Sequence, residues 1–125
     1  MTVPVADPLL VPVARIDGCA LACLIDASTG MVVASLQAEG SINLPAAAGG
    51  AADIANVVAL LSGELATDDG LEDVILTFNH HFHVIRPVRP DMDTQILLLV
   101  ILDRMRTNLA MARRAIRDFC TSLSA

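Results

Sequence analysis

A long Ala-rich segment with almost no polar surface constrains this chain more than any other feature. Residues 45–66 read PAAAGGAADIANVVALLSGELA, and only Asp53 and Glu64 in this stretch carry a charge. At about 100° per residue, a helix over this segment has two adjoining apolar faces and a narrow polar remainder. The large face consists of Ile54, Val57, Val58, Leu61 and Leu65. The small face consists of Ala48, Ala51, Ala52, Ala55, Ala59 and Ser62.

A helix with two apolar faces must pack each face against another part of the protein or against a partner. The bulky face suits packing on a sheet of the same chain, whereas small side chains let two helices approach closely. We therefore predict that the small face meets the same helix of a second copy, in an obligate homo-oligomer. The helix contacts expected in that interface are Ala48, Ala52, Ala55, Ala59 and Ser62.

Composition supports an aliphatic protein that buries surface between copies. The chain has 125 residues, enough for one domain, and is 54% hydrophobic with no Trp or Tyr and three Phe. The formal net charge is −6, and all eight cationic residues are Arg. Binding to nucleic acid requires clustered positive charge, so we expect no nucleic-acid partner.

The sequence predicts a cytoplasmic protein. The longest uninterrupted aliphatic run, residues 96–102, is far shorter than the roughly 20 residues of a membrane span, so no membrane insertion is expected. The N-terminus lacks the basic start and cleavage pattern of a signal peptide. Three cysteines with apolar neighbours, Cys19, Cys23 and Cys120, suit buried thiols in a reducing compartment.

Hydrophobic periodicity predicts the order ββαβββα, an α/β sandwich with a mostly antiparallel sheet. We expect residues 1–15 to be an irregular segment, in which Pro12 would end any short helical turn around 7–10, and residues 16–123 to form a single domain. The predicted strands are 18–26, 31–36, 72–79, 82–88 and 94–102, and the predicted helices are 45–66 and 106–123.

No set of residues has the pattern of an active site. His81 and His83 project on one side of a strand and could hold a metal with Asp91 or Asp93, but an exposed polar hairpin tip, with His80 beside them, is the favoured interpretation. Gly49 and Gly50 could open a phosphate site, but no Lys follows, and close helix packing or a loosened first turn explains them better. The acidic run 68–73 is typical of a solvated turn. We expect no enzyme activity, no cofactor and no bound metal.

Four arginines on the outer face of the last helix are a candidate partner-binding surface. An acidic partner could dock on them, or they could form a solvated face that the helix dipole favours. The four are Arg106, Arg113, Arg114 and Arg117.

The arrangement resembles the roadblock family, the dynein light-chain type that bacteria and archaea also carry. A Gly-initiated hairpin (GCALACLIDASTGMVVAS) precedes the Ala-rich helix, and a meander (VILTFNHHFHVIRPV, then TQILLLVIL) leads to a closing helix (NLAMARRAIRDF). The resemblance covers residues 16–123 and implies a profilin-like α+β sandwich with strand order 2-1-5-4-3. It places the long helix on one face of the sheet and the last helix on the other.

Family members form homodimers by pairing the long helix and the third strand with their copies. The resemblance therefore adds Val74, Leu76 and Phe78 to the expected dimer interface. One departure is that the family begins with a full helix before the first strand, where this chain has a short segment interrupted by prolines.

The resemblance implies regulation rather than chemistry. Bacterial roadblock proteins work beside Ras-like small GTPases as scaffolds or modulators, often together with a sensor kinase. The leading hypothesis is a homodimeric regulator that binds a Ras-like small GTPase and modulates or localises it in a signalling system. The alternatives are a structural dimerisation module of a larger complex without GTPase contact, and a profilin-like or PAS-like small-ligand sensor.

Overall fold

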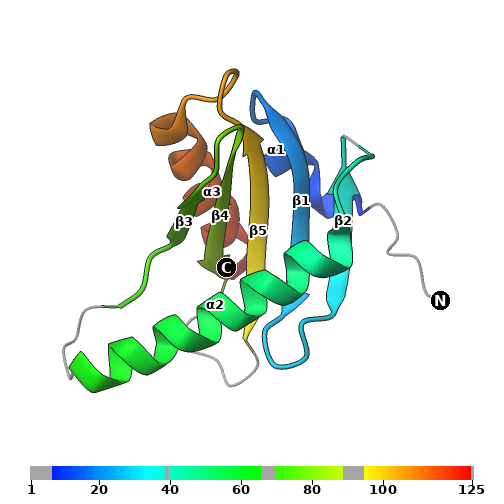
Figure 1. The fold of residues 1–125 in the computed structure, drawn as a ribbon. Helices are drawn as coiled ribbons and strands as arrows, with labels where there is room; N and C mark the ends of the chain where they lie inside the picture. The colour runs from blue at the N-terminus through cyan, green and yellow to red at the C-terminus, as the bar shows by residue number, and fades with distance from the viewer. Residues whose placement is uncertain (1–6, 39, 66–69, 89–94, 125) are drawn as a thin grey trace.

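In the computed structural model, one five-stranded antiparallel sheet lies between two helical layers (Figure 1). The structure describes residues 7–38, 40–65, 70–88 and 95–124, without the side chains of 62–65 and 124. The elements are η1 (Pro8–Leu10), α1 (Val11–Ala14), β1 (Cys19–Asp26), β2 (Val32–Gln37), α2 (Leu44–Leu65), β3 (Val74–Thr77), β4 (His81–Pro87), β5 (Ile96–Asp103) and α3 (Leu109–Ser124). The strand order is β2-β1-β5-β4-β3, as the resemblance implied.

The two central strands, β1 and β5, are buried on both faces. Cys23 lies opposite Leu99 between them, and β4 continues the sheet with Val84 opposite Val100. Their continuous apolar sequences are therefore explained by the two helical layers, since each face of these strands meets a helix rather than water. The predicted antiparallel sandwich is confirmed.

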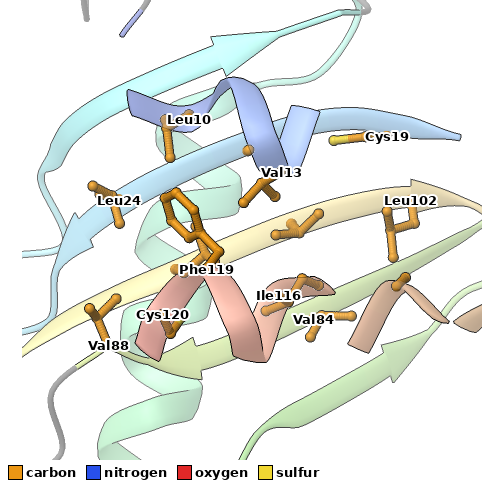
Figure 2. Packing of buried hydrophobic residues seen from close by; sticks show 14 of the residues in the cluster. Leu10, Val13, Cys19, Leu24, Val84, Val88, Leu102, Ile116, Phe119 and Cys120 are labelled. Carbon is orange, nitrogen blue, oxygen red and sulfur yellow. The ribbon is translucent and has the colours of Figure 1, made fainter. Parts of the chain in front are cut away.

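One side of the sheet is covered by α3 together with the N-terminal helical segments (Figure 2). Ile116, Phe119 and Cys120 of α3 pack there with Val84 of β4. The helix begins at Leu109 rather than at the predicted 106, because Asn108 caps it: its side-chain Oδ1 accepts a hydrogen bond from the Met111 backbone N–H at 3.2 Å. Arg106 therefore lies in the turn before α3 and not on the helix.

The N-terminal segment differs from the expectation of an irregular chain. Asp7 accepts the Leu9 N–H, and η1 and α1 then run without a break past Pro12. Proline is tolerated there because the first turn of a helix needs no intrahelical N–H bond. Leu10 and Val13 are fully buried against α3 and the sheet, so residues 8–14 belong to the core of the domain.

The other side of the sheet is covered mainly by the small face of α2, contrary to the predicted orientation, although Ile54 of the large face is half-buried against the same core. Ala48, Ala51, Ala52 and Ala55 are buried against the chain's own sheet rather than left free for a second copy. The reason is the size of the opposing side chains. The sheet presents large aliphatic groups on this side, and only a small helix face fits closely on them. These groups are Leu21, Ile25, Leu97, Leu99 and Ile101.

Two further features of α2 bear on the earlier expectations. Close packing does not explain Gly49 and Gly50, contrary to one of the two expectations for them, since a Cβ on either would meet nothing within 4 Å. By length and composition alone, Leu44–Leu61 is also apolar enough to cross a membrane, contrary to the expectation that no segment is. A helix packed on a sheet passes the same test, and α2 packs on this sheet through residues 48–55.

Candidate partner-binding surface

The second half of α2 presents large aliphatic side chains to solvent. Val57, Leu60 and Leu61 are 66%, 71% and 55% exposed, and we name these three residues the outer stripe. Ala59 continues the buried small face in helical register but is itself exposed, which shows that the helix has left the sheet at this point. Figure 1 shows α2 crossing the sheet and extending beyond it.

The part of α2 that extends beyond the sheet, which we call the overhang, follows from the length of the helix and the width of the sheet. A helix of 22 residues is about 33 Å long, whereas five strands span about 19 Å from first to last axis. One face of α2 therefore cannot be covered along its whole length by the sheet of its own chain. This signal could have identified the outer stripe, of which the prediction placed Val57 and Leu61 against the sheet and did not assign Leu60.

The free edge of the sheet carries apolar side chains on its α2 side. β3 is the last strand in the sheet order and pairs with β4 alone among the described strands. Val74 and Leu76 are half-buried on the α2 side, and Phe78, just after the strand, is 51% exposed. An exposed edge with apolar side chains is a template for pairing with another strand.

The residues predicted for the dimer interface therefore fall into two groups, those that are accessible to a second copy and those that are buried within the chain. Val74, Leu76 and Phe78 lie at the accessible edge, and Ala59 is exposed on the overhang. In contrast, Ala48, Ala52 and Ala55 are buried within the chain, and the side chain of Ser62 lies outside the described residues.

The histidines lie around the β3–β4 turn. The rings of Phe78 and His83 are 4.7 Å apart, and Arg104 donates a hydrogen bond to the Phe78 carbonyl oxygen at 2.8 Å. Burial, with a smaller contribution from His81, lowers the pKa of His83. Among the described residues no group of three His, Cys, Asp or Glu side chains could hold a metal ion, and the proposed ligands Asp91 and Asp93 lie outside those residues.

The arginines of the last helix do not form one free cationic face. Arg113 holds Asp73 through two hydrogen bonds of 2.9 and 3.1 Å, which joins α3 to the start of β3. Arg106, in the preceding turn, pairs with Asp103 at 3.4 Å. Arg114 and Arg117 are exposed, and they remain as the candidate contacts for an acidic partner.

The three cysteines are buried and form no disulfide, as predicted. Burial raises the pKa of Cys19 to about 11 and that of Cys23 to about 12, and it also raises the pKa of Cys120. Thiols are nucleophilic only when ionised, so none of the three is suited to catalysis at neutral pH.

Solved structures, but no family model and no curated protein sequence, match this chain. A Roadblock/LC7 domain from Streptomyces avermitilis is 12% identical, with 90% of this chain and 88% of that chain covered and a TM-score of 0.74. The gliding protein MglB from Thermus thermophilus is 18% identical, with 90% and 80% covered and a TM-score of 0.74. MglB in a tetrameric arrangement is 19% identical, with 92% and 82% covered and a TM-score of 0.76.

This chain has the roadblock fold. The predicted strand order, the long helix on one face and the closing helix on the other all agree with it. Before β1 the described chain forms η1 and α1, and their buried Leu10 and Val13 lie in the same core cluster as Ile116 and Phe119 of α3.

Proposed function

We propose that this protein is a non-catalytic, homodimeric regulator or scaffold that binds a Ras-like small GTPase and modulates or localises it in a cytoplasmic signalling system. The observation that carries the proposal is the outer stripe. Three large aliphatic side chains exposed on two adjacent turns of one helix are typical of a protein–protein interface. Similarity to MglB in a tetrameric arrangement supports self-association.

The self-association surface that we propose combines the overhanging half of α2 with the β3 edge. Pairing of two β3 strands would satisfy the unpaired backbone groups of both edges. Helix contacts from the outer stripe would cover Phe78 and the half-buried Leu76 at the same time. The helix contacts in this proposed interface are Val57, Leu60 and Leu61, rather than the small residues Ala48, Ala52 and Ala55 that the sequence predicted.

A matched pair of substitutions tests the dimer. Val57→Arg places a charge in the outer stripe, and Val33→Arg places the same charge on β2, at the opposite edge, where Val33 is 60% exposed. Sedimentation equilibrium should show a dimer for the parent chain and for Val33→Arg, and mainly monomer for Val57→Arg. A Val57→Arg protein that stays dimeric with the parent's dissociation constant would exclude this interface.

Binding of the GTPase is tested separately, with the parent dimer and a Ras-like small GTPase of the same organism loaded with GDP or with GTPγS. We expect co-elution in at least one nucleotide state. The double substitution Arg114→Glu and Arg117→Glu tests the exposed face of α3 and should weaken binding only if that face takes part. A dimer that binds the GTPase in neither state would favour the structural dimerisation module instead.

The remaining alternative, a small-ligand sensor, receives no support from the described residues. Both faces of the sheet are filled by aliphatic side chains in contact with α2 or α3. A sensor kinase is a second candidate partner and would be tested in the same co-elution experiment.

A further inference from the structure

His83 lies on the sheet face that the proposed dimer would cover. It is directly opposite Leu76 of β3, and Leu76 packs with the α2-side core. Residues directly opposite each other in a sheet project on the same face, so the imidazole is on the α2 side, in ring contact with the half-exposed Phe78. A second copy that covers Phe78 would also remove water from His83.

The groups around His83 offer little compensation for a positive charge. On its own strand, His81 projects on the same side, and β3 carries no charged residue between Val74 and Thr77. On β5, Ile101 is opposite His83, and Asp103, opposite His81, is paired with Arg106. Among the described side chains of α2, Asp53 alone is charged, and it is exposed.

The free chain already favours the neutral imidazole. His83 is half-buried, and this burial lowers its pKa, with His81 adding a repulsive contribution. Further loss of water in a dimer acts in the same direction, because desolvation penalises the charged form.

We propose that His83 makes self-association pH-sensitive, so that the dimer forms with the neutral imidazole and dissociates when His83 is protonated. The proposal rests on the proposed dimer through β3 and α2. Since the pKa would be lower in the dimer than in the free chain, dimer formation releases protons. Affinity is then constant above the free-chain pKa and falls as the pH drops below it. Two copies contribute one imidazole each, so a difference of one pKa unit weakens the dimer by up to about a hundredfold.

Sedimentation equilibrium of the parent chain at pH 7.5, 6.5 and 5.5 tests the proposal. The dissociation constant should rise by about tenfold or more across this range. His83→Gln, which cannot be protonated, should form a dimer whose dissociation constant changes less than threefold. His80→Gln, a control at an exposed position of the turn between β3 and β4, should keep the parent's pH dependence.

Each outcome decides between the hypotheses. A parent dimer with a pH-independent dissociation constant overturns the role of His83 and leaves the proposed dimer intact. The same pH dependence in His83→Gln as in the parent also overturns it. A dimer that tightens at low pH would mean that a carboxylate such as the partner's Asp53 pairs with the imidazolium, which contradicts the proposal. A chain that is monomeric at every pH overturns the proposed dimer itself.

Discussion

At the scale of single residues, the contact between Asp73 and Arg113 is the best-formed ion pair in the described part of the chain. The Asp73 side chain is 7% exposed and accepts two hydrogen bonds from one guanidinium, whereas Glu72 beside it is 54% exposed and 3.6–4.0 Å from its Arg partners. The sequence could not predict this pair, because the two residues are 40 positions apart and only the packing of α3 across the sheet brings them together.

Replacing Asp73 by Asn should destabilise the fold modestly. The Arg113 side chain is 40% exposed, so the expected loss is about 1 kcal/mol rather than the larger figure for a fully buried charged hydrogen bond. Thermal unfolding should show a midpoint about 3–5 °C lower. Glu72→Gln is the control and should change the midpoint by less than half as much.

At the scale of elements, sequence patterns located every strand and both long helices, but they assigned the faces of α2 incorrectly. Periodicity shows that a helix has two apolar faces, but it does not show which face lies on the sheet. That choice depends on the volume left above Leu21, Leu99 and their neighbours, where the helix residues that become fully buried are alanines. The same limit explains why the prediction treated Leu61 as core and Ala55 as interface.

The N-terminal segment gives an element-scale prediction with a neighbouring control. Leu10 is fully buried beneath η1 and α1, and Leu9 is 46% exposed. Leu10→Ala should lower the free energy of unfolding by about 2–5 kcal/mol, because it leaves a cavity in the α3-side core. Leu9→Ala should cost less than about 1 kcal/mol. Urea unfolding of both variants measures the difference, and equal costs would show that this segment is not part of the cooperative unit.

At the scale of the whole molecule, the fold could be predicted because nearly every element has a consistent pattern: central strands apolar on both faces, edge strands mixed, and an amphipathic closing helix. The assembly could not be predicted from the sequence, since it depends on which apolar surface remains exposed after the chain has folded. In the structure this surface is the outer stripe together with the β3 edge, and the dimer that we propose would have a stability that depends on protein concentration.

The dependence of stability on protein concentration can be measured by thermal unfolding. If the native state is a dimer and the unfolded chain is a monomer, the unfolding midpoint rises with protein concentration, because mass action favours the associated form. Calorimetry over a hundredfold concentration range should show a rise of several degrees for the parent chain, and a midpoint independent of concentration for Val57→Arg. A flat midpoint for the parent would point to a monomer at these concentrations.

The unequal support of α2 also has a consequence for the exchange of its backbone hydrogens with solvent. Residues 48–55 are held by the sheet, and Asn56 donates a side-chain hydrogen bond of 3.4 Å to the Ala27 carbonyl oxygen, but Val57 to Leu61 project beyond these contacts. In a single chain this end can open without disturbing the core, so its amides should exchange much faster than those of residues 48–55. A bound partner that covers the outer stripe would slow exchange at Val57 to Leu61 toward the rates of residues 48–55. The rate of deuterium uptake at each amide of α2 would then show whether a partner is bound to the outer stripe.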